Sequence, residues 1–103
     1  MAEPSPIAPA VQSVAEIATP NAARYLQQLC KHFQHKRPVT CDQRSGQIEF
    51  SIGDCRLDAG EGVLKLTLAA PDASDLEQLQ DVVARHLLRF AFREEMQIGW
   101  RLA

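Results

Sequence analysis

Residues 38–70 read PVTCDQRSGQIEFSIGDCRLDAGEGVLKLTLAA, and this stretch decides the fold class. Apolar residues occupy alternate positions through most of it, which is typical of strands that bury one face. The turn signals RSG, GD and AGEG separate four such segments. We therefore predict a four-stranded antiparallel meander, in which Gly53 is the first residue of a two-residue hairpin turn. The alternating apolar residues are Val39, Cys41, Ile48, Phe50, Ile52, Cys55, Leu57, Leu64, Leu66 and Leu68.

The segment before the meander has the three- and four-residue spacing of an amphipathic helix. Thr19 can accept hydrogen bonds from free backbone amides at the helix start, and Pro20 suits the first helical position. Lys36 and Pro38 mark its end. We predict a helix over residues 20–35. Its apolar stripe consists of Ala22, Leu26, Leu29 and Phe33.

A second amphipathic helix is predicted after the meander. Following Pro71, either Asp72 or Ser74 can cap the first turn, and Ser74 with Glu77 has the spacing of a capping box. We predict that this helix runs to about Phe92. Its apolar stripe consists of Leu76, Leu79, Val83, Leu87 and Phe90.

Two further strands complete the predicted fold. Residues 11–18 alternate weakly, and residues 96–102 alternate more clearly. The predicted order is β-α-β-β-β-β-α-β, an α+β fold. Because each helix has one apolar stripe, we expect both helices to pack on the same face of an antiparallel sheet. The 103 residues suit a single domain over residues 11–103, preceded by a flexible lead at 1–10.

The composition argues against several classes of function. The formal net charge is −2 and the pI is about 5.9, so the chain has no overall attraction toward polyanions. We therefore predict neither nucleic-acid binding nor membrane binding. The N-terminus lacks the pattern of a signal peptide, and no apolar run is long enough to cross a membrane. We expect a cytoplasmic protein.

The three cysteines, Cys30, Cys41 and Cys55, form an odd set without CxxC spacing. This pattern favours reduced thiols over a disulfide framework or a zinc ribbon. All three lie on predicted apolar faces, so we expect them to be buried. The predicted hairpin registers place Cys41 opposite Ile48 and Cys55 opposite Ile52. About 15 Å would then separate these two thiols, which is beyond disulfide reach.

The end of the first predicted helix, LCKHFQHK, concentrates a thiol, two imidazoles and two ammonium groups. Helix geometry places Cys30 about 140–200° around the axis from His32 and His35, so the three cannot hold one ion. Lys31 and Lys36 also repel a divalent cation. Cations at a helix C-terminus are commonly stabilised by the helix dipole alone. Recognition of an anion or a partner, and metal binding by the histidine pair, are the open alternatives.

The second predicted helix ends in another basic group. Arg85, Arg89 and Arg93 follow four-residue steps and form a ridge that can bind a carboxylate or phosphate. More often such a ridge is solvated or paired with nearby acids, here Asp81, Glu94 and Glu95. His86 lies at the margin of the apolar stripe. There we expect a buried imidazole bonded to a backbone carbonyl rather than a catalytic base.

The sequence indicates no reaction. The sheet face away from the helices is predicted to be polar, with cross-strand pairs such as Arg56 with Glu49, and it lacks an aromatic platform for bases. No nucleophile elbow, P-loop, dinucleotide fingerprint, HExxH or EF-hand spacing occurs, so we expect no cofactor. An enzyme using Cys30 or Cys55 with His86 would need an exposed thiolate beside a base, whereas we predict buried thiols.

Three blocks carry a resemblance to a known family: RYLQQLCKHFQHK (24–36), GDCRLDA (53–59) and RHLLRFAFREEMQIGW (85–100). They resemble the bacterial domain of unknown function 2218 (DUF2218) across residues 19–100. The family has no established activity, and the resemblance implies only an accessory role around iron or siderophore metabolism. The positions that match the family pattern are Arg24, Tyr25, Cys30, Lys31, His32, His35, Lys36, Arg56, His86 and Arg93.

These features favour a non-enzymatic binding module over the other classes. An acidic small molecule or an acidic protein partner would suit it, because guanidinium and ammonium groups bind oxyanions best. The predicted ligand-binding residues are Lys31, His32, His35, Lys36, Arg85, Arg89 and Arg93. The alternative is an iron- or zinc-binding protein that uses His32, His35 and His86. The ligand, the pathway and the oligomeric state stay open.

Overall fold

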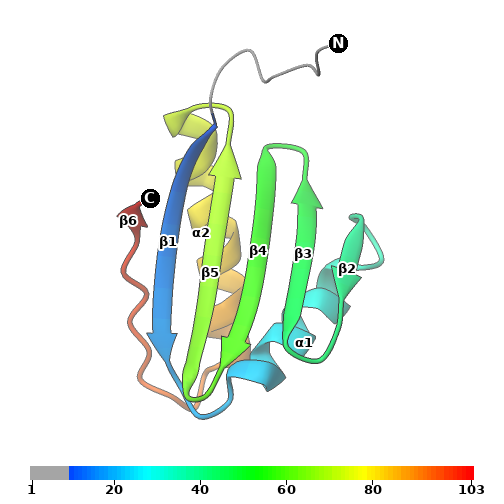
Figure 1. The fold of residues 1–103 in the computed structure, drawn as a ribbon, viewed down its shortest axis with the longest axis vertical. Coiled ribbons are helices and arrows are strands. Elements are labelled where there is room, and N and C mark those ends of the chain that lie inside the picture. Colours follow the sequence, from blue (N-terminus) through cyan, green and yellow to red (C-terminus); the bar gives the residue numbers. More distant parts are fainter. Residues whose placement is uncertain (1–9) are drawn as a thin grey trace.

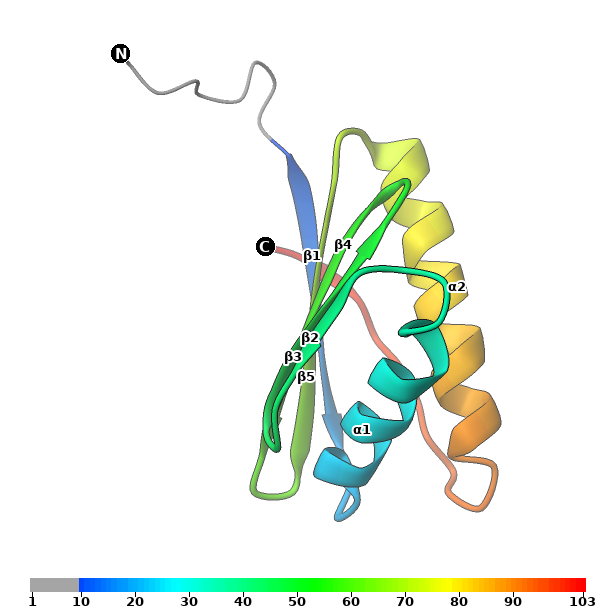
Figure 2. The ribbon, with the colours of Figure 1, turned by 90° about the vertical axis from the view of Figure 1, so that its right-hand side faces the viewer.

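The computed structural model describes residues 10–103 as an antiparallel sheet with two helices on one of its faces (Figure 1 and Figure 2). The predicted α+β class and order of elements are confirmed. The predicted lead at 1–10 lies outside the described residues, apart from Ala10. The elements are β1 (Val11–Ala18), α1 (Ala22–Phe33), β2 (Val39–Cys41), β3 (Ser45–Phe50), β4 (Gly53–Gly60), β5 (Val63–Ala70), α2 (Ala73–Phe90) and β6 (Arg101–Leu102).

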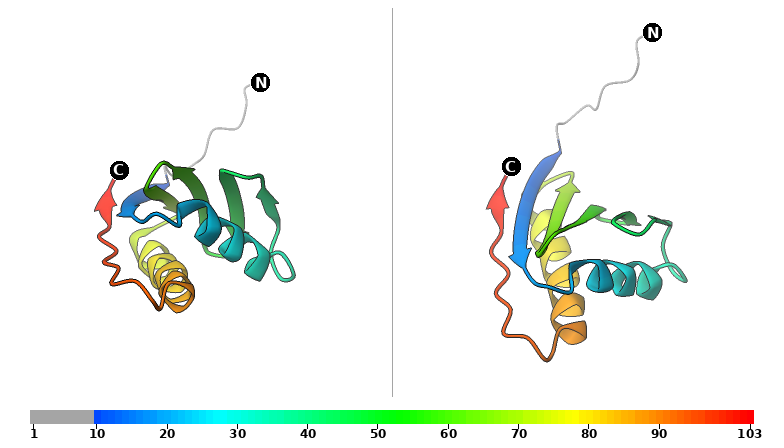
Figure 3. Two further views of the ribbon diagram at one scale, coloured as in Figure 1. Left: turned by 90° about the horizontal axis from the view of Figure 1, so that it is seen from below. Right: turned by 60° about the horizontal axis from the view of Figure 1, so that its bottom comes forward.

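The sheet has six strands in the order β2-β3-β4-β5-β1-β6, and all neighbouring strands are antiparallel. Strands β2 to β5 form the predicted meander. Strand β1 pairs with β5 along its whole length, from Val11 opposite Ala70 to Ala18 opposite Val63. Helix α1 therefore carries the chain from β1 to the far edge strand β2. Figure 3 shows from below that both helices lie on the same side of the sheet, as predicted.

The core lies between the sheet and the two helices. The inward side chains of β5, Leu64, Leu66 and Leu68, have no exposed surface, and Leu26 of α1 and Leu79 of α2 are equally buried. Burying a leucine side chain completely contributes about 1.5–3 kcal/mol relative to leaving it in water. The apolar stripes predicted from helical spacing therefore do face the sheet.

Two hairpin registers differ from the prediction. Cys41 lies opposite Gly46 rather than Ile48, and Cys55 lies opposite Ile48 rather than Ile52. The partner of Cys41 shifts by two residues and that of Cys55 by four, and an even shift keeps every side chain on its predicted face of the sheet. Cys55 is buried as predicted, but the predicted burial of Cys41 is wrong. Cys41 is exposed because it ends β2, a three-residue strand at the edge of the sheet.

The turn between β3 and β4 explains one of these differences. Ser51 and Ile52 form the turn, and Gly53 follows it opposite Phe50. Gly53 is therefore not the first turn residue, and that prediction was wrong. It has φ 155°, and a Cβ at this position would lie 2.2 Å from the carbonyl oxygen of Ala69 on β5. Only glycine fits this close approach of β4 and β5.

Both helices are shorter than predicted. Helix α1 begins at Ala22 after Asn21, and the Oγ1 of Thr19 accepts a hydrogen bond from the Asn21 amide at 3.1 Å. Of the two predicted caps of α2, Asp72 is the one used, because its carboxylate accepts from the Asp75 amide at 2.8 Å. Each helix ends two residues before its predicted boundary, and the chain continues in turns. The tighter turns satisfy carbonyls at the helix ends.

The closing strand is shorter than the predicted 96–102. Only Arg101 and Leu102 pair with β1. The segment before them packs half-buried apolar side chains against the core without strand pairing, namely Met96, Ile98 and Trp100. Alternation reports which side of an extended segment is buried, and it does not require a hydrogen-bonded neighbour.

Candidate functional site

The fold brings His32 of α1 against His86 of α2. Their ring centroids lie 4.8 Å apart. Two phenylalanines support the pair, since the His32 ring lies 4.8 Å from that of Phe33 and 5.8 Å from that of Phe90. The two imidazoles therefore mark the junction of the helices, at a position held by packing rather than by a loop.

His86 is the more enclosed member of the pair. It is half-buried, and its Nδ1 lies 2.7 Å from the carbonyl oxygen of Val82. A carbonyl oxygen only accepts, so Nδ1 carries the proton of this hydrogen bond. The bond to a backbone carbonyl is the one predicted for this residue. It leaves Nε2 as the nitrogen that can interact with His32 or with a ligand.

His32 is exposed and lies among cations. Desolvation, followed by the nearby charges of His86, Lys36 and Arg89, lowers the pKa of His32 below its ordinary value of 6.5. All three charge effects have the same sign, because each positive neighbour disfavours the imidazolium form. The helix junction is therefore a place of positive potential.

Two shallow hollows adjoin the histidine pair. One, of about 250 Å³, is lined by Gln28, Lys31, His32 and Phe90. The other, of about 210 Å³, is lined by Arg85, His86 and Arg89. We use the name helix-junction surface for the polar residues gathered here, which are Lys31, His32, Lys36, Arg85, His86 and Arg89.

Five of the seven residues predicted to bind a ligand belong to this surface, and the other two do not. His35 lies in the turn after α1, and within residues 10–103 its ring contacts neither His32 nor His86. Arg93 lies beyond the end of α2, where its guanidinium is 5.3 Å from the centre of the Phe92 ring. The site is therefore built from α1, from Lys36 in the turn after it and from α2, rather than from the continuous run LCKHFQHK.

Few acids neutralise the helix-junction surface. Arg85 pairs with Asp81 at 2.9 Å, but both side chains are more than 60% exposed, so the pair contributes little. In the part of the chain that the structure describes, no ion pair involves Lys31, Lys36 or Arg89. These charges are available to an anion from solution.

The metal alternative lacks a third ligand. Across residues 10–103, no group of three or more histidine, cysteine, aspartate or glutamate side chains is placed to hold an ion. His32 and His86 meet, but His35 does not join them. Protein zinc sites ordinarily use three or four protein ligands.

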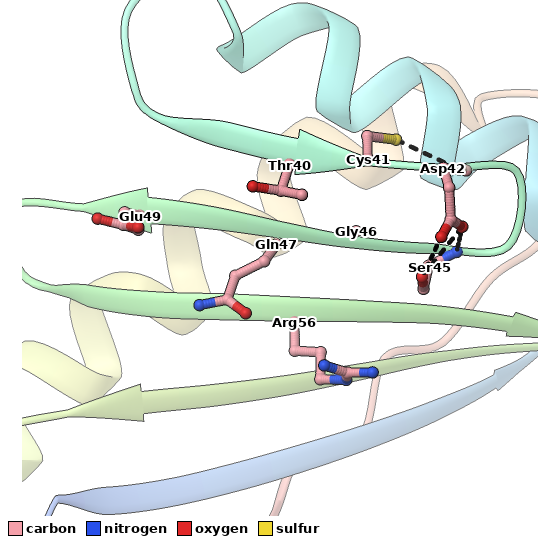
Figure 4. Close-up of a pocket in the computed structure, with 8 residues that line it drawn as sticks. All are labelled: Thr40, Cys41, Asp42, Ser45, Gly46, Gln47, Glu49 and Arg56. Atoms are coloured by element: carbon pink, nitrogen blue, oxygen red, sulfur yellow. Dashed lines mark hydrogen bonds between the residues drawn. The ribbon is translucent and has the colours of Figure 1, made fainter.

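The open face of the sheet carries a second, weaker candidate. A hollow of about 300 Å³ lies over β2, β3 and β4, and Figure 4 shows the side chains around it. Its charges are mixed, since Glu49 and Arg56 both line it. Arg56 pairs with Asp58 at 3.2 Å, so the predicted pair of Arg56 with Glu49 is wrong. The register places Gln47 opposite Arg56. Mixed polarity of this kind is typical of a solvated sheet face.

A carboxylate network that the sequence did not reveal fixes the start of α1. Glu94, after α2, accepts hydrogen bonds from Thr19 at 2.9 Å, from the Asn21 amide group at 2.8 Å and from the Tyr25 hydroxyl. The bonds from Tyr25, Asn21 and Thr19 lower the pKa of Glu94, and the Glu94 bond raises the pKa of Tyr25. The network ties the start of α1 to the segment that follows α2. The sequence had offered Glu94 only as one of three possible partners of the arginine ridge.

Comparison with known proteins places the chain in a bacterial family. Residues 14–101 match a family described as an uncharacterised protein conserved in bacteria, DUF2218. The chain belongs to the DUF2218 family. The match confirms the resemblance of the three sequence blocks, and it brings no established activity with it.

A solved structure shares this fold. The NMR structure of PA4090 from Pseudomonas aeruginosa is 37% identical in sequence, with a TM-score of 0.76. The similarity covers 88% of this DUF2218 chain and 95% of the other. No curated protein matches the chain. Over residues 10–103, neither helix is long and apolar enough to span a membrane.

Proposed function

We propose that this DUF2218 protein is a non-enzymatic cytoplasmic binding module that recognises an oxyanion at the helix-junction surface. The ligand is a carboxylate- or phosphate-bearing small molecule, or an acidic segment of a partner protein. The observation that carries the proposal is the contact between His32 and His86, at a centroid distance of 4.8 Å, beside Arg89 of α2 and Lys36 of the turn after α1.

The electrostatics support an anion as the missing component. Bringing Lys36, Arg89 and two imidazoles together raises the free energy of the folded state, because like charges repel. Desolvation, and after it this repulsion, lowers the pKa of His32. A bound oxyanion reverses the effect, since it favours the imidazolium form. Binding of the anion and protonation of His32 are therefore expected to strengthen each other.

The chemistry of the side chains indicates how the anion is held. Arg89 can donate two parallel hydrogen bonds to one carboxylate or phosphate, and the ammonium groups of Lys31 and Lys36 act as point charges at the rim. The imidazolium form of His32 adds further hydrogen-bond donors. The hollows are shallow, so a compact polyanion fits better than a large apolar ligand.

The test is a ligand titration followed by NMR signals of the histidine rings. Inorganic phosphate and citrate serve as probes, and ferric citrate tests the iron-related role that the family resemblance implies. We expect the pKa of His32 to rise on addition of the anion. The double charge reversal Lys31→Glu with Lys36→Glu should weaken binding at least about tenfold, or 1.4 kcal/mol.

A matched control changes the net charge equally at another place. Arg44 in the β2–β3 turn and Lys65 on β5 are exposed and lie outside the helix-junction surface. The pair of reversals Arg44→Glu with Lys65→Glu should leave binding unchanged apart from general charge effects. Equal affinities of the two double variants for both probes, or histidine signals that do not move on titration, would refute the proposal.

A further inference from the structure

Cys30 of α1 and Cys41 of β2 lie side by side. Cys41 is paired with Gly46 in the β2–β3 ladder, and the side-chain positions of such a pair point to the same side of the sheet. Gly46 has no side chain, and the sulfur of Cys30 occupies the free space. A Cβ on Gly46 would lie 2.7 Å from the Cys30 sulfur and 3.7 Å from the Cys41 sulfur. Both sulfurs therefore lie next to the same position, the space above the Cα of Gly46.

The two thiols differ in access. Cys30 is 3% exposed, and burial together with the Cys41 side chain raises its pKa to about 12. Cys41 is exposed at the end of β2, where its thiol donates to the carbonyl oxygen of Asp42 at 3.5 Å (Figure 4). A groove of about 560 Å³ opens onto both thiols, and the cationic side chains of Arg24 and Lys31 also line it.

We propose that Cys30 and Cys41 form a reversible oxidation site, in which hydrogen peroxide or an organic hydroperoxide converts the two thiols into an intramolecular disulfide. An exposed thiol beside a buried one is the arrangement of an attacking and a resolving cysteine. Lys31 lines this groove as well as the helix-junction surface, but the redox chemistry is independent of the proposed oxyanion recognition, because it takes place at the sulfurs and requires no bound ligand.

The first step takes place at Cys41. Its thiolate attacks one peroxide oxygen, the S–O bond forms as the O–O bond breaks, and the departing oxygen leaves as water or alcohol after taking a proton. Cys41 is then a sulfenic acid. The cations of Arg24 and Lys31 line the groove and favour departure of the anionic oxygen.

The second step joins the two sulfurs. Cys30 attacks the sulfur of Cys41, the S–O bond breaks, and the proton of Cys30 leaves with the hydroxide as water. Two thiols have then been oxidised, and one hydrogen peroxide has been reduced to two molecules of water. A dithiol reductant restores the thiols by exchange through a mixed disulfide.

Cys55 provides the internal control. It is also near Cys30, whose charge contributes to raising the pKa of Cys55, but burial is the larger cause. Its side chain has no exposed surface, so a peroxide from solution cannot reach it first. The access of Cys41, rather than closeness to Cys30 alone, decides which pair forms.

The experiment treats the full chain with hydrogen peroxide and maps peptides under non-reducing conditions. We expect a Cys30–Cys41 linkage with the loss of two hydrogens, reversed by dithiothreitol. Cys55→Ser should form the same linkage, and Cys41→Ser should form none. In Cys30→Ser, the sulfenic acid of Cys41 should persist and be trapped by dimedone.

Other products would overturn the proposal. These are a Cys30–Cys55 linkage, disulfide dimers through Cys41 alone, or over-oxidation of Cys41 without a cross-link in the wild-type chain. Cys41→Ser changes an exposed residue and should keep the wild-type circular dichroism spectrum. It therefore tests the linkage even if Cys30→Ser, a core substitution, fails to fold.

Discussion

Gly46→Ala should destabilise the protein through a single atom, the sulfur of Cys30. The new Cβ would lie 2.7 Å from that sulfur, about 1 Å inside ordinary contact, whereas its distances to the Thr40 carbonyl oxygen and the Cys41 sulfur are 3.4 and 3.7 Å. Overpacking of a core by a methyl group costs about 1–3 kcal/mol. The φ of Gly46 lies outside the left-handed region, so the backbone accepts alanine.

Removing the sulfur should remove the cost. In a Cys30→Ala background, the alanine at position 46 no longer clashes with a sulfur. Gly46→Ala should then stabilise the protein by about 0.4–1 kcal/mol, because alanine reduces the conformational freedom of the unfolded chain. The double-mutant cycle should therefore show a coupling free energy of about 1–3 kcal/mol between the two positions. Urea unfolding of the four proteins at neutral pH measures it, because each difference in the free energy of unfolding is obtained from the midpoint and slope.

Gly53→Ala is the matched comparison. Its Cβ would meet a backbone oxygen, that of Ala69, at 2.2 Å with φ at 155°, and truncating a side chain cannot relieve that contact. Its cost should be the same with Cys30 or with alanine at position 30. If Gly46→Ala lowers the free energy of unfolding equally in both backgrounds, the Cys30 sulfur does not occupy the space above Gly46. The proposed closeness of Cys30 and Cys41 would then be wrong as well.

Three further predictions concern stability. Leu66→Ala, at a fully buried position of β5, should lower the free energy of unfolding by about 2–5 kcal/mol in urea titrations; a smaller loss would contradict the core as described. Asp72→Ala removes the α2 cap and should cost about 0.5–2 kcal/mol, with Asp72→Asn as the control that retains an acceptor. Because hydrogen bonding lowers the folded-state pKa of Glu94, its stabilisation is present above its ordinary pKa of 4.5 and is lost as pH falls through the folded value. The Glu94→Gln variant should therefore have a lower free energy of unfolding than wild type at neutral pH, and this difference should shrink in acid. A difference that stays constant with pH would show that ionisation of Glu94 does not contribute to stability.

Local patterns in the sequence determined the elements and their order. Periods of two and of 3.6 residues report which side of a strand or helix is buried, because side-chain direction is tied to backbone geometry within a few residues. The stripe of Leu26 and Leu29 and the alternation of Leu64, Leu66 and Leu68 were recognisable for this reason, and the structure buries all five. The family could also be recognised from the sequence, and its model matches residues 14–101.

Tertiary packing decided which side chains meet. His32 with His86, Cys30 with Cys41 and Glu94 with Tyr25 are each separated by many residues or by a change of element. Their contacts depend on how the two helices cross and on hairpin registers, which a shift by an even number of residues alters without changing the alternation. The hydrophobic periodicity cannot reveal such a shift, because the same faces of the strands stay buried. The predicted basic residues were therefore recognisable as candidates, but the surface they form and the thiol pair exist only through the packing of α1 against α2 and the sheet.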